Sequence, residues 1–374
     1  MFGRRSDGRV VRSIDPIVAL TPYLMPMRCD AQVMLTYKAD YEPLARYIVA
    51  KGAEGYKLSF MDIVLAAYVR AISQMPELNR FIANKRIYAR KELAVSFVVL
   101  KNTTDGSVQE NVVKCKFDPH DTILDVAART GEAISQARQE ETDNSTMKVA
   151  KFLLNPILAT TIAGLARLLD RYGLMPRFLV EASPFHTSMF ITNMASIGMP
   201  AVNHHIYNFG TTSVFISIGS LERGVTVNAK GEAQRKRVLP IGITADERVC
   251  AGMIYAKMVA MVSKYLADPQ LLEQPPEQVL FDGDNYYGWR ISPRIWRDNP
   301  QAIARSMNRH HEPIGLWWLF HVSIPGGYTT RVAFIRSHAY NRGTAYQHAR
   351  RPHERSQRLP VSLFPAVCQL AHAI

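Results

Sequence analysis

The sequence lacks the short motifs that would identify several large classes of enzyme. Its 374 residues contain no G-x-x-x-x-G-K-[ST] phosphate loop, no G-x-S-x-G nucleophile elbow and no H-E-x-x-H zinc-binding motif. Each of these motifs places a phosphate cradle, a nucleophile or a pair of metal ligands at a fixed spacing. Phosphate-loop nucleotide hydrolases, α/β serine hydrolases and zinc peptidases are therefore unsupported.

Cysteine is also scarce. The four cysteines, Cys29, Cys115, Cys250 and Cys368, are far apart and form no C-x-x-C pair. This spacing excludes a cysteine zinc site and offers no disulfide framework, so we expect free thiols and no bound metal. The N-terminal residues Met1–Val10 are rich in arginine and hold no apolar run, which predicts no secretory signal. Together these features predict a cytoplasmic protein.

Lysine disappears after Asp284, and most of the positive charge lies beyond that point. Residues 285–374 hold 12 Arg, no Lys and 3 acidic residues, so they carry +9 of the net +13. Because the basicity belongs to this tail, we expect no nucleic-acid partner for the main domain. The break in composition predicts that 285–374 is a poorly ordered extension, or not native coding sequence. A separate domain, or a basic patch for nucleic acid or membrane, is an alternative.

Before the tail, apolar residues alternate between strand and helix spacing, which predicts an α/β domain over 14–284 behind an N-terminal arm, 1–13. Ser59 is the expected N-cap of one helix, and Pro76 is expected to end it. Helices are expected at 41–51, 60–75, 121–139 and 252–266. Strands are expected at 31–38, 81–83, 86–88, 93–100, 188–193, 212–220 and 236–245.

One region is unusually hydrophobic. Phe152–Leu169 is a nearly continuous apolar run of 18 residues, and Leu174–Val180 follows it. That length is at the lower limit for a membrane span, but Asn155 and Pro156 interrupt it. We expect a buried or surface-docked helical hairpin inserted at about 147–182. The alternative is a membrane-surface helix that brings Phe152–Val180 into contact with lipid.

Four segments resemble, in the correct order, the acyltransferase catalytic domain of 2-oxoacid dehydrogenase complexes. Leu58–Phe81 resembles an early helix that ends in P-x-L-N. Ser188–Gly198 (S-M-F-I-T-N-M-A-S-I-G) resembles the F-T-I-S-N-L-G strand, and Gly210–Leu221 resembles the A-I-L-G-V-G strand. Asp246–Gly252 (D-E-R-V-C-A-G) resembles the D-H-R-V-x-D-G signature, and the next helix ends in L-A-D-P. The resemblance covers Ile14–Asp268.

This resemblance implies a two-layer, chloramphenicol acetyltransferase-like fold in which helices pack on a mixed β-sheet. It also implies a homotrimer with active sites between subunits, where CoA or acyl-CoA and a small-molecule acceptor enter one channel. No lipoyl domain or subunit-binding domain is recognisable before Ile14, so we expect a stand-alone domain rather than a complete core component.

The signature departs from the family at the positions that handle protons. The catalytic base, a histidine in the family, is replaced by Glu247, and the aspartate or asparagine four residues later is replaced by Ala251. The hydroxyl donor to the oxyanion falls on Thr192, followed by Asn193. Glutamate is a poor base for a thiol, since its reference pKa is about 4.3 against about 8.5 for the thiol. Burial can raise that pKa, although an ion pair of Glu247 with Arg248 or another cation is an alternative role.

Other side chains are candidates to replace the missing histidine. His204 and His205 form a tandem pair, and His186 lies shortly before the predicted 188–193 strand. A solvated loop position is the plainer interpretation of the tandem pair. Cys250 is a candidate nucleophile, although a small buried side chain is the simpler role.

Two functions therefore compete. The first is transfer of an acyl group between CoA and an acceptor, with activity reduced or lost because the signature has Glu247 and Ala251. The second is a non-catalytic trimeric scaffold, or a CoA- or acyl-binding relative of the same fold. Nucleic-acid binding through the tail is a weaker third hypothesis.

Overall fold

The computed structural model describes residues 5–12, 14–102, 108–139, 155–227, 231–282, 320–324 and 328–332. The chain divides into two units, residues 1–298 with 361–374, and residues 299–360. In the second unit, β11 (Phe320–Ile324) and β12 (Tyr328–Val332) pair as antiparallel strands. Apart from these two strands, the prediction of a poorly ordered 285–374 lies outside the described residues.

A mixed seven-stranded sheet forms the centre of the first unit. Its strand order is β2-β10-β8-β7-β5-β6, and β9 pairs with the N-terminal part of β10. The pairs β5–β7 and β7–β8 are parallel, and the others are antiparallel. Its strands are β2 (Gln32–Asp40), β5 (Leu93–Asn102), β6 (Val108–Phe117), β7 (Met189–Asn193), β8 (Val214–Ile218), β9 (Glu222–Val227) and β10 (Ala233–Asp246).

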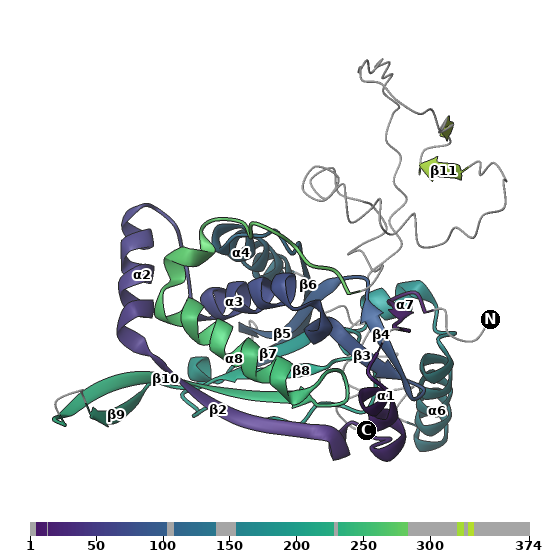
Figure 1. The fold of residues 1–374 in the computed structure, drawn as a ribbon, viewed down its shortest axis with the longest axis horizontal. Helices are drawn as coiled ribbons and strands as arrows, with labels where there is room; N and C mark the ends of the chain where they lie inside the picture. Colours follow the sequence, from purple (N-terminus) through teal and green to yellow (C-terminus); the bar gives the residue numbers. More distant parts are fainter. Residues whose placement is uncertain are drawn as a thin grey trace. The chain divides into compact units, whose positions relative to one another are not determined.

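Helices cover one face of this sheet (Figure 1). They are α2 (Tyr41–Ala53), α3 (Phe60–Gln74), α4 (Ile123–Gln139) and α8 (Gly252–Ala267). The central helix, α3, begins at a capping box, in which the Ser59 amide donates to Asp62 Oδ2 at 2.8 Å and the Asp62 amide donates to Ser59 Oγ at 3.3 Å. Residues 62–73 of α3 are all buried, so α3 is the core of this layer. The expected α/β architecture of helices packed on a mixed sheet is confirmed.

A second, smaller sheet has the order β1-β4-β3. Its strands are β1 (Gly8–Val10), β3 (Arg80–Ala83) and β4 (Arg86–Arg90). The strands predicted at 81–83 and 86–88 thus form a hairpin outside the central sheet. The N-terminal segment is tied to the domain through β1, and α1 (Pro16–Leu24) follows it.

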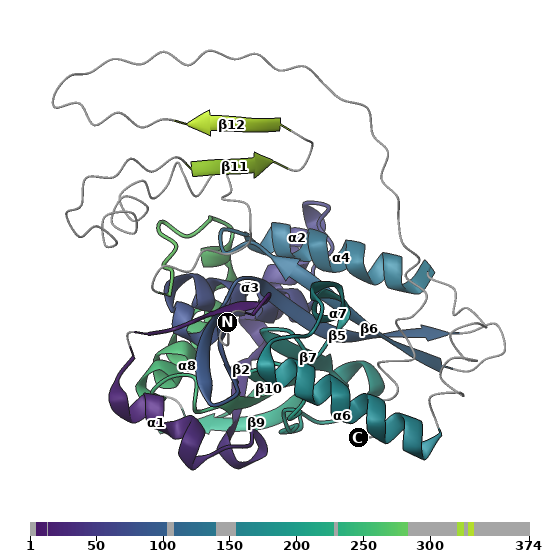
Figure 2. The same ribbon diagram turned by 90° about the vertical axis from the view of Figure 1, so that its right-hand side faces the viewer.

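The hydrophobic region forms two helices, α6 (Pro156–Tyr172) and α7 (Arg177–Ala182). Figure 2 shows α6 at the surface, and most of its side chains are exposed. The buried form of the expected insertion is therefore wrong. Within the described ranges, no helix is both long and apolar enough to cross a membrane. The remaining short elements are η1 (Cys29–Ala31), η2 (Pro76–Asn79), η3 (Met194–Ile197) and η4 (Pro269–Leu272).

Candidate functional site

The signature turn follows β10 and is built on a buried ion pair. Asp246, the last residue of β10, is fully buried, and Arg248 is 2% exposed. Arg248 donates from Nε to Asp246 Oδ1 at 2.8 Å and from Nη2 to Oδ2 at 2.7 Å. Its Nη1 donates to the backbone carbonyls of Met25 and Pro26 at 2.9 and 3.2 Å. The bidentate pair therefore ties the end of β10 to the segment that follows α1.

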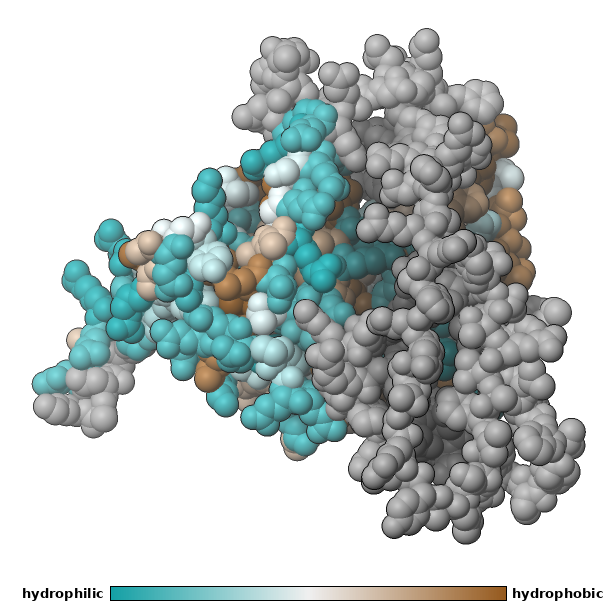
Figure 3. Space-filling model, turned by 90° about the horizontal axis from the view of Figure 1, so that it is seen from above, coloured by the Kyte–Doolittle hydropathy of each residue, from teal (hydrophilic) through white to brown (hydrophobic). Residues whose placement is uncertain are grey.

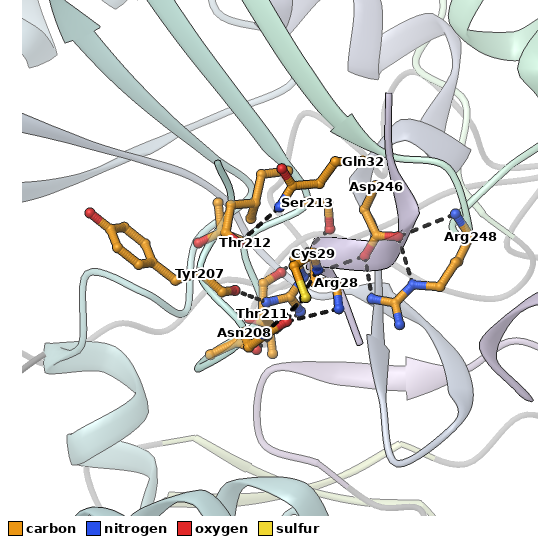
Figure 4. Close-up of polar contacts among 12 residues, drawn as sticks. Arg28, Cys29, Gln32, Tyr207, Asn208, Thr211, Thr212, Ser213, Asp246 and Arg248 are labelled. Carbon is orange, nitrogen blue, oxygen red and sulfur yellow. Dashed lines mark hydrogen bonds and ion pairs between the residues drawn. The ribbon is translucent and has the colours of Figure 1, made fainter. Parts of the chain in front are cut away.

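A second arginine enters the same cluster from the other side (Figure 4). The Arg28 Nε lies 3.4 Å from Asp246 Oδ2, and its guanidinium also donates to the carbonyls of Tyr207 and, at 3.2 Å, Gly210. The Arg28 amide donates to Asn208 Oδ1 at 2.8 Å. Three distant segments, 25–28, 207–210 and 246–248, thus meet at one carboxylate.

This cluster holds two buried arginines for one aspartate. Burial lowers the pKa of Arg28 below its usual value, the Asp246 charge opposes that shift, and the Arg248 charge adds to it. Buried charges of this kind are tolerated only when nearly every donor has a partner. The backbone carbonyls around Arg28 and Arg248 supply those partners, so the cluster fixes the backbone of the turn.

Glu247 lies between these two buried residues but its side chain is exposed. Its amide donates to the Ala31 carbonyl at 2.9 Å, so the backbone position is fixed. Among the ion pairs of the described part of the chain, none involves Glu247. The alternative that Glu247 pairs with Arg248 is wrong, because Arg248 is fully used by Asp246 and by backbone carbonyls. Ala251 is the N-cap residue of α8 and supplies no side-chain cap.

Thr192 lies on β7, on the sheet face opposite the helices. It shares that face with Phe190, whose ring stacks on Phe215 at 5.3 Å between centroids. The Thr192 side chain is half-buried, and its Oγ1 contacts Met194 Sδ at 3.6 Å. The neighbouring Asn193 is exposed.

Thr192 and Glu247 do not meet within one chain. Thr192 pairs with Ser217 on β8, which pairs with Gly242 on β10, and Glu247 follows five positions later. With about 3.3 Å per residue and about 4.8 Å between strands, this offset corresponds to roughly 19 Å.

The tandem histidines lie in a loop that crosses the same sheet face as Thr192. The His204 ring stacks on Phe215 at 4.2 Å and on the His205 ring at 4.5 Å between centroids. Because Phe215 is two residues from Ser217, which pairs with Thr192 of β7, His204 lies on the same sheet face as Thr192. His204 is half-buried and His205 is exposed. The solvated-loop interpretation therefore fits His205 better than His204.

Close backbone contact holds this loop on the sheet. The Ser217 Oγ donates to the Val202 carbonyl at 2.5 Å and accepts from the Val202 amide at 3.0 Å. A Cβ on Gly242 would lie 2.4 Å from the Val202 carbonyl oxygen, and a Cβ on Gly219 would lie 2.0 Å from the Ala201 amide nitrogen. Only glycine at these positions allows the loop to approach so closely.

Two other candidates are occupied structurally. His186 is buried, with Nε2 3.1 Å from Asp170 Oδ1 and Nδ1 2.8 Å from Ser183 Oγ. Cys250 is buried, and that burial raises the pKa of its thiol to about 12. A thiol of this pKa remains protonated at neutral pH, which disfavours Cys250 as a nucleophile.

The buried ion cluster of Arg28, Asp246 and Arg248 was not predicted from the sequence. Asp246 and Arg248 lie inside the signature, on either side of Glu247. Their opposite charges were the one feature of the sequence that indicated an ion pair at this turn. Arg28 gave no signal, because nothing in the sequence relates it to a strand end more than 200 positions away. In the described part of the chain, no group of three or more His, Cys, Asp or Glu is arranged to hold a metal ion.

Around this site, helices cover one face of a mixed sheet, and the signature turn lies at the end of β10. Residues 185–273 match the family model described as 2-oxoacid dehydrogenases acyltransferase (catalytic domain). The matched stretch contains Thr192, both tandem histidines and Glu247. This stretch of the chain is thus similar to the acyltransferase catalytic domain of 2-oxoacid dehydrogenases, and the resemblance drawn from the sequence is confirmed.

A curated relative is the dihydrolipoyllysine-residue acetyltransferase component of the pyruvate dehydrogenase complex from Mycoplasma capricolum. It is 20% identical over 226 residues, which cover 59% of this chain and 40% of the relative. The chain therefore spans less than half the length of that relative.

Solved structures with a similar arrangement include a dihydrolipoamide acetyltransferase of Azotobacter vinelandii, studied for the role of a serine, a histidine and an asparagine in its catalytic mechanism. It is 18% identical, covers 68% of this chain and 88% of its own, and has a TM-score of 0.45. A chloramphenicol acetyltransferase is 14% identical, covers 69% of this chain and 99% of its own, and has a TM-score of 0.41.

Proposed function

We propose that this protein transfers an acyl group between coenzyme A and a nucleophilic acceptor. The observation that carries the proposal is the family match over 185–273, which includes the intact turn around Asp246 and Arg248. In such a transfer, the acceptor attacks the thioester carbonyl, a base takes the acceptor's proton, and a hydroxyl or amide donor stabilises the oxyanion. The thiolate of CoA then leaves.

Four residues are candidates for these steps. Glu247 occupies the position of the base, and its backbone is held in place by the Ala31 carbonyl and by the buried residues on either side. Thr192 supplies the hydroxyl to the oxyanion. His204 or His205 is the substitute base, since their loop shares the sheet face of Thr192.

We propose further that the active species is a homotrimer. The support is the separation of Thr192 from Glu247 within one chain, which a neighbouring copy would remove by bringing its own Glu247 to Thr192. A cytoplasmic location belongs to the same proposal, since Cys29, Cys115 and Cys250 are all free thiols.

The test is release of free thiol from acetyl-CoA and longer acyl-CoA by the purified full chain. We expect a wild-type rate above background that falls in a Glu247→Gln, His205→Ala double variant. Glu54→Gln, which removes an exposed carboxylate at the end of α2, is the control and should retain the wild-type rate. Equal rates for wild type and the double variant would show that these residues catalyse no transfer.

A non-catalytic binder of CoA, or a trimeric scaffold, is the second candidate. It is favoured by the exposed Glu247 and by Ala251, because neither residue is set up to handle a proton. A binder is stabilised by roughly 2.7 kcal/mol at a ligand concentration of a hundred times Kd, so CoA should raise its Tm. A scaffold without a CoA site should show no shift.

Lipid contact through Phe152–Val180 is independent of either function and rests on the surface of α6.

A further inference from the structure

The large apolar side chains of α6 point away from the domain. The side that faces the protein carries small or buried residues at helical spacing, namely Ala159, Ala163, Ala166 and Asp170. The outer side carries Ile157, Leu165, Leu168 and Tyr172, which are 78%, 54%, 53% and 39% exposed. A helix in a soluble domain normally has the reverse arrangement, so this face is built to contact something else.

The helix is held in this orientation by buried charges. Asp170, near the end of α6, accepts from Arg5 Nη2 at 2.6 Å and lies 3.1 Å from His186 Nε2. The N-cap Asn155 accepts from the Ile157 amide at 3.1 Å. The C-terminal end of α6 is therefore anchored to the domain through Asp170, with the leucines on the outer side.

A second helix presents an apolar surface on the same side of the molecule. Ile17, Leu20 and Leu24 of α1 are 76%, 56% and 77% exposed, and α1 contains no charged residue. Figure 2 shows α1 and α6 on the face turned toward the viewer. In Figure 3, hydrophobic side chains gather at the right-hand edge, the side on which α6 lies in Figure 1.

The turn between β3 and β4 links the two helices. The Lys85 Nζ lies 5.4 Å from the ring centroid of Tyr23 on α1, and Arg171 Nε of α6 donates to Asn84 Oδ1 at 3.2 Å. Asn84 and Lys85 both have positive φ, 46° and 60°, which makes this turn tight. We call α1, α6 and this turn the α1–α6 surface.

Within α1, α6 and the turn, the exposed charges are all positive, and the exposed carboxylate of the N-cap Asp15 lies at the edge of the surface. Lys85 and Arg86 are exposed in the turn, and Arg167 and Arg171 are exposed on the flank of α6 next to its apolar face. The single carboxylate of α6, Asp170, is buried. An apolar helical face bordered by arginine is the pattern of a helix that lies in the membrane interface. A contact that placed this surface against the same surface of a second copy would bring these cations together, so the charge favours an anionic occupant.

We propose that the α1–α6 surface docks the protein on a membrane surface that contains anionic lipid. The apolar side chains of both helices enter the boundary between headgroups and acyl chains, while the four cations contact lipid phosphates. This binding is independent of acyl transfer, so it can be tested even if the proposed activity fails.

Co-sedimentation of the full chain with lipid vesicles tests the proposal. We expect the wild type to sediment with vesicles of mixed phosphatidylcholine and phosphatidylglycerol, and several-fold less with phosphatidylcholine alone. A Leu165→Ser, Leu168→Ser variant should partition about tenfold more weakly, since each leucine loses apolar contact with the bilayer. Arg167→Gln, Arg171→Gln should lose roughly tenfold on the anionic vesicles only.

The matched control is Val49→Ser, Val225→Ser, which removes two apolar side chains of 72% and 68% exposure from α2 and β9. It should sediment like the wild type. Equal loss in the control and in the leucine variant would show that binding is nonspecific and overturn the proposal. No sedimentation of the wild type, or a lower oligomeric mass of the leucine variant by light scattering, would overturn it in favour of a protein contact.

Discussion

The Nη2 of Arg248 lies 2.7 Å from Oδ2 of Asp246, and both side chains are almost completely buried. Because Arg28 approaches the same carboxylate, removal of Asp246 would leave two buried cations without a counter-charge. Breaking a buried pair in this way costs about 3–5 kcal/mol. We therefore expect Asp246→Asn to lower the free energy of unfolding by about that amount in chemical denaturation.

The neighbouring residue provides the control for this measurement. Glu247→Gln changes an exposed side chain that forms no ion pair with the described residues, so the free energy of unfolding of this variant should stay within about 0.5 kcal/mol of wild type. If Glu247→Gln is as destabilising as Asp246→Asn, the buried cluster is not what fixes the turn.

Restoring the family's proton-handling residues should increase acyl transfer. In a Glu247→His, Ala251→Asp variant, a neutral imidazole replaces the carboxylate at the base position, and a carboxylate returns four residues later. General base catalysis contributes roughly 10²–10⁴ in rate, so we expect thiol release from acetyl-CoA to increase within that range. Glu247→Ala, Ala251→Asp lacks the imidazole and serves as the comparison. Equal rates in the two variants would contradict the role assigned to position 247.

Much of the fold follows from local sequence patterns. Ser59 and Pro76 bound α3 as predicted, because capping and the missing proline amide act within a few residues. The antiparallel partner of β5, Val108–Phe117, was not predicted. It alternates apolar and polar residues only weakly, and its place at the sheet edge is decided by pairing with β5.

The site was less predictable than the fold. The signature located Glu247, but its exposure is decided by the side chains on either side, which are taken into the cluster with Arg28. Which residues share a face with Thr192 depends on the β7–β8–β10 register, which no local pattern specifies. Likewise, hydrophobicity identified the segment around α6, but the orientation of that helix depends on the contacts of Asp170 with Arg5 and His186.

Gly242 should be intolerant of even the smallest side chain. A Cβ there would lie 2.4 Å from the Val202 carbonyl oxygen and 2.7 Å from Ser217 Oγ, so the loop that carries His204 would have to move. We expect Gly242→Ala to destabilise the protein by about 1–3 kcal/mol in thermal or chemical denaturation.

Gly131→Ala is the control, since a Cβ in that position of α4 meets no atom within 4 Å. It should stabilise the helix by roughly 0.5–1 kcal/mol. A neutral Gly242→Ala would mean that the loop is not pressed against the sheet.

The contact of Asp170 with Arg5 and His186 should make stability depend on acidity. Burial alone would raise the pKa of Asp170, but the hydrogen bond and charge of His186 and the charge of Arg5 lower it well below the usual 3.8. As the pH falls, the Asp170 carboxylate is therefore protonated at a higher pH in the unfolded chain than in the folded chain. The stabilisation by Asp170 is complete above about pH 5 and is lost as the pH falls through and below 4.

Asp170→Asn should lower the free energy of unfolding by about 3 kcal/mol at neutral pH, and the difference from wild type should shrink as the pH decreases toward 2. Urea denaturation across this range measures both effects, and Asp30→Asn, an exposed carboxylate, should stay within about 0.5 kcal/mol of wild type at neutral pH. A gap between wild type and Asp170→Asn that is constant with pH would show that the loss comes from packing and not from the charge of Asp170.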